Sequence, residues 1–298
     1  MQSRIIRAGL VALLVAGLLA ATAGSAAAAP ATPGAPAAVA ARSSGVNDWG
    51  CRPSAAHPNP VVLLHGLGAP SAGHWIYMAP YLASEGYCVF YFTYGKVSPL
   101  IPLGGFRPID ESAREIGRFI DDVRAATRAA EVDVVGHSEG GFQSLYIPKV
   151  LDYGGKIGRV VSLAPPTHGT TFASLVQVAN LLGIRATVDF VLRTFGCDAC
   201  SDLIVGGPAV RTLTDGPIAE PGVSYTVIAS RTDVLVTPTE TSFVREPGVH
   251  NMYVQDLCPF DPVGHIGMAF DPGVATMISN ALDPSSAVPV TCSVGLPF

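Results

Sequence analysis

Short apolar runs alternate with longer amphipathic stretches along most of this chain. The runs have the length and the Val, Ile and Leu content of buried strands, and they cover residues 60–65, 87–94, 132–136, 160–164, 223–229 and 249–254. Helical spacing marks the stretches 74–84, 110–130, 140–151 and 272–282, the last with Asp271 as its N-cap. Repeated strand–helix units predict an α/β fold, with a mostly parallel central sheet flanked by helices on both faces.

The segment 165–221 departs from this alternation. It carries apolar helical patterns at 172–182 and 186–195, then a pair of cysteines, then Gly-Pro segments typical of loops. The segment is too long for a simple connection and too apolar for a free loop. We interpret it as a cap insertion over the carboxyl edge of the sheet.

The amino-terminal residues 1–29 have the pattern of a signal peptide. Arg4 and Arg7 precede an apolar run at 8–22, and small residues follow. The run is about fifteen residues long, shorter than the ~20 that a spanning helix needs, so we favour cleavage over a membrane anchor. Cleavage fits near 27–29 or after 38–40. An Ala/Pro-rich leader at 30–45 then precedes a single domain at 46–298, and we expect a secreted protein without an integral membrane span.

The charge balance removes some classes of partner. The formal net charge is −5, and it becomes −7 without Arg4 and Arg7. The chain contains no basic block, so nucleic acid is not an expected partner. No cluster of His, Asp or Cys has the spacing of a metal site, and we expect neither a metal nor another cofactor.

Six cysteines in an exported chain suit three disulfides. Fifteen pairings are possible in principle. We favour a tie between neighbouring strands, a small local loop and a tie from the penultimate loop to the carboxyl tail: Cys51–Cys88, Cys197–Cys200 and Cys258–Cys292. The spacing of Cys197 and Cys200 also occurs in redox motifs, but no thioredoxin-like pattern surrounds it.

One stretch carries the pattern of a nucleophile. The apolar run at 132–136 leads directly into Gly136-His-Ser-Glu-Gly140, and a helical stretch follows. In a G-x-S-x-G elbow the serine sits on a tight, strained turn, and the flanking positions must lack side chains to avoid a collision across that turn. Ser138 is therefore the candidate nucleophile.

A serine nucleophile needs a base and an acid, and on this architecture they follow it in the order acid, then histidine. Four histidines precede the serine and a fifth precedes any strand that could supply the acid; these are His57, His65, His74, His137 and His168. His250 opens a predicted strand, whereas His265 lies in the glycine-rich loop 261–267 and is our candidate base. Asp233 follows the 223–229 strand and is the candidate acid.

Several other carboxylates compete with Asp233 for that role. Asp215, Glu220 and Glu240 suit solvated surface positions, while Asp256 and Asp261 lie on the connection that carries His265 itself. The oxyanion of an acyl-transfer intermediate also needs two backbone donors. We expect them from Glu139, directly after the serine, and from Leu67 in the small-residue loop after the first strand.

Five stretches taken together resemble the secreted actinobacterial lipases of the α/β-hydrolase superfamily, often called class 2 lipases; they are 60–68, 135–141, 164–170, 228–238 and 255–265. The resemblance spans about residues 46–292. It implies an α/β-hydrolase fold with Ser138, Asp233 and His265 as the triad, Leu67 and Glu139 as oxyanion donors, and three intrachain disulfides. Such lipases commonly have Met or Gln after the serine, where this chain has Glu139.

The implied function is hydrolysis of acyl esters, triacylglycerols or similar lipids, through an acyl-enzyme intermediate. The expected partners are a small-molecule lipid ester and a lipid–water interface; the sequence leaves the oligomeric state open. Two alternatives use the same fold. One is a polyester- or cutin-type ester hydrolase with an open site, and the other is a catalytically silent secreted binding protein.

Overall fold

Six parallel strands form one sheet in the computed structural model, which describes residues 45–171, 183 and 196–298. The strands are β1 (Val61–Leu64), β2 (Val89–Tyr91), β3 (Val132–His137), β4 (Ile157–Leu163), β5 (Ser224–Ala229) and β6 (Val249–Tyr253). Their order is β2-β1-β3-β4-β5-β6, and every neighbouring pair is parallel. The predicted parallel sheet is confirmed.

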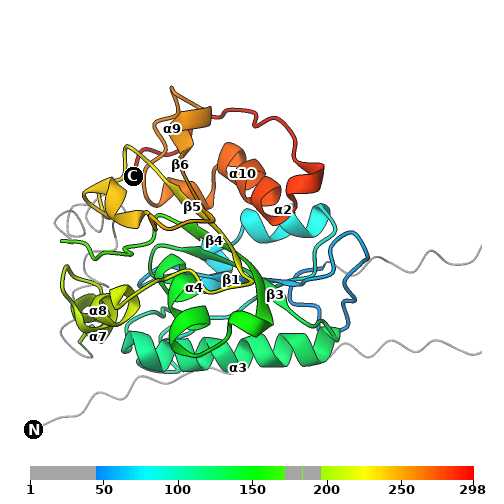
Figure 1. The fold of residues 1–298 in the computed structure, drawn as a ribbon, viewed down its shortest axis with the longest axis horizontal. Coiled ribbons are helices and arrows are strands. Elements are labelled where there is room, and N and C mark those ends of the chain that lie inside the picture. Colours follow the sequence, from blue (N-terminus) through cyan, green and yellow to red (C-terminus); the bar gives the residue numbers. More distant parts are fainter. Residues whose placement is uncertain (1–44, 172–182, 184–195) are drawn as a thin grey trace, which may run out of the picture. The chain divides into compact units, whose positions relative to one another are not determined.

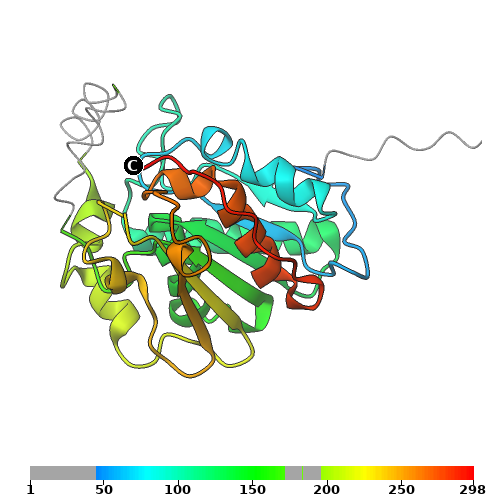
Figure 2. The ribbon, with the colours of Figure 1, turned by 90° about the horizontal axis from the view of Figure 1, so that it is seen from above.

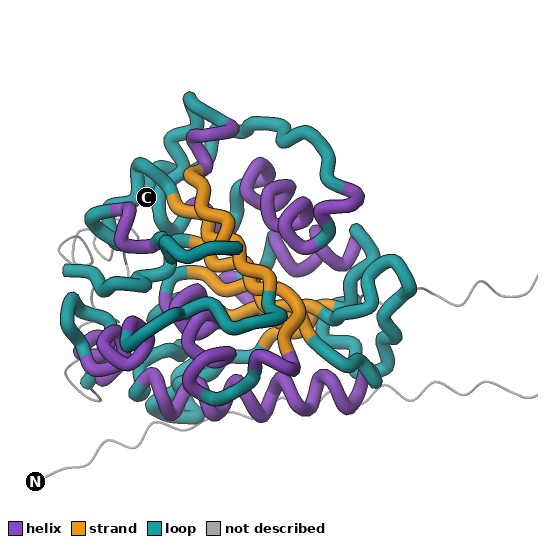
Figure 3. The backbone as a smooth tube through the Cα atoms, in the orientation of Figure 1, coloured by secondary structure: helices purple, strands orange, loops and turns teal. Residues whose placement is uncertain are grey.

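Helices cover both faces of the sheet (Figures 1 and 3). The helices of the described residues are α1 (Ser71–His74), α2 (Met78–Ser84), α3 (Ile109–Thr127), α4 (Glu139–Val150), α7 (Asp198–Asp202), α8 (Pro208–Thr214), α9 (Val254–Leu257) and α10 (Pro272–Leu282). One core cluster joins α3, α4 and α8 to the sheet, and a second joins α2 and α10 to it. Figure 2 shows α10 crossing over the strands.

Successive side chains of a strand belong alternately to the two core clusters. Val62 and Leu64 belong to the first cluster, and Val61 and Leu63 belong to the second. All four side chains are fully buried. Because successive side chains on a strand point to opposite faces, a run that is apolar at every position suits a sheet covered on both sides.

Three elements differ from the sequence-based expectation. The helix expected at 74–84 is split, because Pro80 in the first turn of α2 would collide with the backbone of a helix continuing from Ile76. The strand expected at 87–94 is limited to β2. The Gly-Pro segment expected as a loop contains α8, which begins with Pro208 and buries Val210 and Leu213 in the core.

Several expectations fall outside the described residues. These are the signal peptide at 1–29, the leader as far as residue 44, and the apolar patterns at 172–182 and 186–195. The described part of the expected cap holds α7 and α8 (Figure 1). Among the described residues no helix has the length and apolarity to span a membrane.

The three favoured disulfides are present, and all six cysteines are used. They join Cys51 to Cys88, Cys197 to Cys200 and Cys258 to Cys292. The first links the chain before β1 to the start of β2. The last links the end of α9 to the segment after α10, which returns toward the loop that carries His265.

Candidate active site

The site lies where the strand order reverses. β1 and β3 are neighbours in the sheet although β2 separates them in the chain. In open parallel sheets the loops that follow two such strands diverge and leave a crevice at the carboxyl edge. Leu67 follows β1 and Ser138 follows β3, so both lie at this edge of the sheet.

Ser138 occupies a strained elbow between β3 and α4. Its backbone has φ 58° and ψ −120°, in the left-handed half of φ space that a residue with a side chain rarely adopts. A Cβ atom added at Gly136 would collide with the carbonyl of Gly140, and one added at Gly140 would collide with the carbonyl of Leu64. The turn therefore requires glycine at both positions.

His265 and Asp233 form a buried pair. The Nδ1 atom of His265 lies 2.6 Å from Oδ2 of Asp233, and both side chains are almost fully buried. The other carboxylate oxygen of Asp233 accepts the amide N–H groups of Leu235 at 2.7 Å and Val236 at 2.9 Å. An ionised Asp233 places the proton of neutral His265 on Nδ1 and leaves Nε2 as an acceptor.

The pKa of Asp233 fits this assignment. Burial alone raises the pKa of a carboxyl group, but the His265 ring and the amides of Val236 and Leu235 outweigh burial and hold this pKa below its usual value. Two of the rival carboxylates have other partners. Asp256 pairs with Arg231, and Oδ1 of Asp261 accepts backbone N–H groups.

His137 joins the pair to the elbow. Its Nε2 lies 2.8 Å from the backbone oxygen of His265, and its Nδ1 lies 3.0 Å from Nε2 of His74 on α1. The rings of His137 and His265 are 4.8 Å apart between centroids. Since His137 is bonded to Ser138, these contacts bring the loop of His265 beside the serine.

The loop after β1 approaches the serine from the other side. A Cβ atom at Gly66 would lie 3.2 Å from Cβ of Ser138. The amide of Gly68 donates to the carbonyl of Gly104 at 2.8 Å, and the hydroxyl of Tyr94 donates to the carbonyl of His65 at 2.6 Å. These two bonds hold the loop in place.

The two backbone amides predicted as oxyanion donors have unused N–H groups. Across the described residues, no hydrogen bond uses the amide N–H of Leu67 or of Glu139. Glu139 is the first residue of α4, where a helix leaves its amides without an internal acceptor and presents its positive dipole end. The geometry offers two N–H groups next to the elbow.

The side chain of Glu139 is the least expected feature of the site. It is 1% exposed, and within the described part of the chain neither carboxyl oxygen has a hydrogen-bond partner. The carboxyl group is packed directly against the backbone of Gly105. Burial, followed by the charge of Asp202, holds the pKa of Glu139 well above its usual value.

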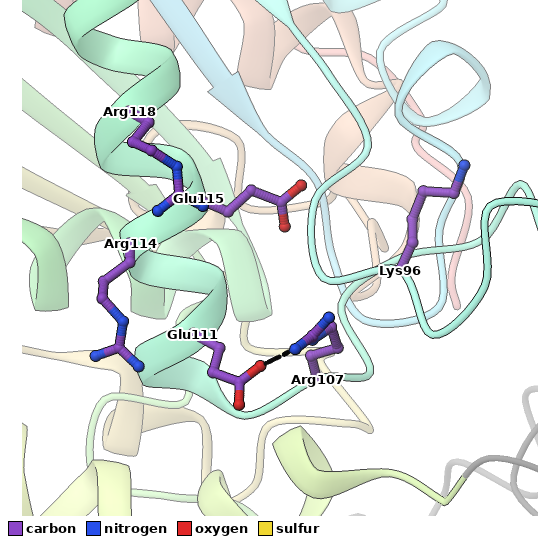
Figure 4. A pocket seen from close by; sticks show the side chains of 6 residues that line it. All are labelled: Lys96, Arg107, Glu111, Arg114, Glu115 and Arg118. Atoms are coloured by element: carbon purple, nitrogen blue, oxygen red, sulfur yellow. Dashed lines mark hydrogen bonds and ion pairs between the residues drawn. The ribbon is translucent and has the colours of Figure 1, made fainter.

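A charged cavity lies apart from these residues, between α3 and the loop after β2 (Figure 4). Its volume is about 440 Å³, and its lining consists of Lys96, Arg107, Glu111, Arg114, Glu115 and Arg118. Arg107 pairs with Glu111, and Arg114 pairs with Asp110. None of the predicted site residues lines this cavity.

Sequence reasoning missed the residues that support the site. The sequence patterns assign no role to His137, His74 or Tyr94. The adjacent glycines Gly104 and Gly105 are the one local signal for the support of the β1 loop. A bond from the Gly264 amide to the Leu296 carbonyl, 2.8 Å long, joins segments too far apart in the sequence for any pattern to reveal.

Known proteins share parts of this sequence and fold. A family model described as the alpha/beta hydrolase fold matches residues 59–194. Triacylglycerol lipases of Pseudarthrobacter phenanthrenivorans and Burkholderia plantarii are each 30% identical over 131 residues, 41% of this chain. That match covers 38% and 34% of the two lipases, so the chain spans little more than a third of their length.

Among solved structures, lipase B of Aspergillus fumigatus is similar, with a TM-score of 0.60 and 20% identity. The similarity covers 81% of this chain and 57% of that one. The strand order, the flanking helices and these matches agree. The chain has the α/β-hydrolase fold, with a parallel six-stranded sheet flanked by helices.

Proposed function

We propose that this chain is a serine-dependent carboxylic-ester hydrolase, a lipase or carboxylesterase that acts on lipid-type acyl esters. The observation that carries the proposal is the buried pair of Asp233 and His265, 2.6 Å apart, beside a serine on a strained glycine elbow. A silent fold has no need to retain an ionised carboxylate that orients a histidine next to such a serine.

Each group of the site has a defined role in the mechanism. Ser138 Oγ attacks the ester carbonyl carbon while Nε2 of His265 takes its proton, and Asp233 stabilises the imidazolium. The amides of Leu67 and Glu139 donate to the oxyanion, where one lost donor typically costs ~2.7–4 kcal/mol. His265 then protonates the departing alcohol. A water molecule, deprotonated by His265, attacks the acyl-enzyme, and His265 returns this proton to Ser138 Oγ as the acid leaves.

The distribution of exposed apolar side chains supports a lipid substrate. In the described part of the chain, seven of these large side chains lie in segments that follow the carboxyl ends of strands: Ile76, Leu100, Ile204, Val205, Val234, Leu257 and Phe260. Leu100 is 91% exposed and Phe260 is 97% exposed. Exposed apolar groups in the segments that leave this edge of the sheet suit contact with acyl chains or a lipid–water interface.

Export is part of the proposal. The three disulfides form and persist in an oxidising compartment. The signal-like segment at 1–29 supplies the route. Sizing the protein recovered from the medium against the full chain would test both cleavage and export.

Hydrolysis of p-nitrophenyl esters of increasing chain length tests the activity, with Ser138→Ala in parallel. The control is Ser84→Ala, which removes an exposed hydroxyl far along the chain from the elbow. We expect turnover of long-chain esters, an inactive Ser138→Ala variant and an unchanged control.

The other outcomes separate the alternatives. Turnover of short esters alone would indicate a carboxylesterase rather than a lipase. Faster release of carboxylic acid from polyester films than from lipid emulsions would favour the polymer hydrolase. Equal activity in Ser138→Ala, or failure of the wild type to react with a fluorophosphonate probe, would contradict the proposal.

A further inference from the structure

His137 touches three parts of the site at once. It is bonded to Ser138, its Nε2 lies 2.8 Å from the backbone oxygen of His265, and a Cβ atom on Gly66 would lie 3.5 Å from its Nδ1. The side chain is 2% exposed. One ring therefore lies between the nucleophile, the base and the loop that offers an oxyanion donor.

The contacts of the His137 ring fix its tautomer. A backbone carbonyl accepts hydrogen bonds and cannot donate, so Nε2 of His137 carries a proton and donates to the oxygen of His265. Burial, together with the charge of His265, lowers the pKa of His137 to about 3, so the ring is neutral and Nδ1 is unprotonated. Nδ1 must then accept from Nε2–H of His74, 3.0 Å away.

The titratable groups around His137 leave this direction unchanged. His74 approaches from α1, His265 and Asp233 from the loops after β6 and β5, and His65 from the loop after β1. Burial lowers the pKa of His74 well below its usual value and that of His65 to about 4. The hydrogen bonds therefore run in one direction, from His74 to His137 to the backbone of His265.

The base is thus held at two points. Asp233 binds Nδ1 of the His265 ring, and His137 binds the backbone oxygen of the same residue. With only the ring contact, the His265 backbone could shift and carry Nε2 away from the serine. With both contacts, the direction of Nε2 is determined.

We propose that His137 is a positioning residue, which receives a hydrogen bond from His74 and uses its own N–H to hold the backbone of the base in line with Ser138. This inference rests on the proposed function, since it concerns how Ser138 is activated. It assigns a role to two histidines that the triad mechanism leaves unused.

The first test replaces His137 with Leu and with Gln. Leu removes the donor, whereas the side-chain amide of Gln can place an N–H near the position of Nε2. For His137→Leu we expect kcat to fall roughly 10- to 100-fold with KM changed less than about twofold, because misplacing a base costs rate rather than binding. The rate of fluorophosphonate labelling should fall in parallel, and His137→Gln should recover most of both losses.

The matched control is His168→Leu. Nε2 of His168 also lies near a backbone carbonyl, that of Phe243, at 3.0 Å. The substitution removes the same type of bond from a residue outside the proposed site. We expect its kcat to equal that of the wild type.

A second test asks whether the two bonds act in series. His74→Leu leaves His137 without its donor and should lower kcat a few-fold. If His74 acts only through His137, then the double variant His74→Leu/His137→Leu is no slower than His137→Leu, within about twofold. Additive losses would overturn the series arrangement; if His137→Leu does not fold, an unchanged kcat in His74→Leu would overturn it instead.

Different results would contradict the proposed hydrolase function and the proposed role of His137. An active Ser138→Ala variant would overturn the proposed function. A dead Ser138→Ala variant beside a folded His137→Leu variant with unchanged kcat would overturn only the role of His137. A loss in His137→Leu that Gln does not recover would also count against a hydrogen-bonding role and indicate loss of packing instead.

Discussion

The two halves of the candidate site are built differently. The nucleophile half lies on the central strands β1 and β3 and depends on close backbone contacts, with Gly136 and Gly140 closed against neighbouring carbonyls. The half with Asp233 and His265 lies on loops after β5 and β6, toward one edge of the sheet. There the geometry depends on hydrogen bonds from distant segments.

Because of this difference, substitutions in one half should mainly lower stability, and substitutions in the other half should mainly lower activity. A change at the elbow disturbs the core of the sheet, so the whole domain should lose stability. A change around His265 should alter the direction of one imidazole and leave the sheet intact. Four experiments test that separation, from the largest expected effect to the smallest.

The largest effect is expected for Asp233→Asn. The neutral amide would favour the wrong tautomer of His265, and in serine hydrolases such a change typically lowers kcat by about 10⁴. The free energy of unfolding at pH 7 should change far less than the activity does. Steady-state kinetics beside urea unfolding would measure both; a loss of stability large enough to unfold the domain would contradict the separation.

The two long disulfides offer a matched pair. Cys51–Cys88 and Cys258–Cys292 close loops of similar sequence separation, 37 and 34 residues. Chain entropy therefore predicts a similar loss of stability when either is removed by Cys→Ala substitution, about 4 kcal/mol. Only removal of Cys258–Cys292 should also lower kcat at temperatures where the protein stays folded, about tenfold, because it frees the tail near His265.

Each disulfide is removed by replacing both of its cysteines with alanine. Chemical denaturation then measures the stability of the two variants, and steady-state kinetics measures their activity. Equal activity in the two variants would mean that the tail does not hold the base. An activity loss confined to the variant lacking Cys51–Cys88 would reverse the expected pattern.

Gly140→Ala tests the elbow half. The added methyl group would collide with the Leu64 carbonyl, which belongs to a central strand and cannot move away cheaply. We expect a loss of roughly 3 kcal/mol in the free energy of unfolding, at the upper end for overpacking. Gly155→Ala is the control, since a Cβ atom there meets nothing within 4 Å. Equal unfolding midpoints for the two variants would contradict the close contact.

The smallest effect concerns Glu139 and pH. Its folded-state pKa is raised, so the folded state binds more protons than the unfolded one above the usual pKa of a glutamate, and stability falls as pH rises through that range. Glu139→Gln should remove this pH dependence, as measured by unfolding at a series of pH values above the usual pKa of a glutamate. An unchanged pH profile would mean that Glu139 is ionised in the folded protein.

The elbow half could be predicted almost completely from the sequence. Its pattern is local: an apolar run, Gly136 and Gly140 around a serine, and a helix directly after them. Tight turns next to strands restrict residue type so strongly that a few letters identify them. The N-cap of α10 is an equally local signal, because Asp271 directly precedes the proline that begins the helix, and its side chain accepts the amide of Val274 at 2.9 Å.

The surroundings of His265 could be predicted only in part. Chain order led to Asp233 and His265, but sequence separation conceals which side chains hold them. His137 and His265 are 128 residues apart, and their hydrogen bond leaves no periodic pattern. The helix α8 was missed because its glycine- and proline-rich flanks resemble a loop, while its burial depends on contact with α4.

The segment 295–298 has a consequence for the order in which the molecule comes apart on heating. It has no regular structure, yet its carbonyls at Leu296 and Phe298 accept the amides of Gly264 and Gly267, on either side of His265. Segments held by few bonds open well before the sheet does. Warming should therefore lower the proposed ester-hydrolase activity reversibly below the melting temperature. The rates at which those two glycine amides exchange with solvent deuterium should rise over the same temperature range.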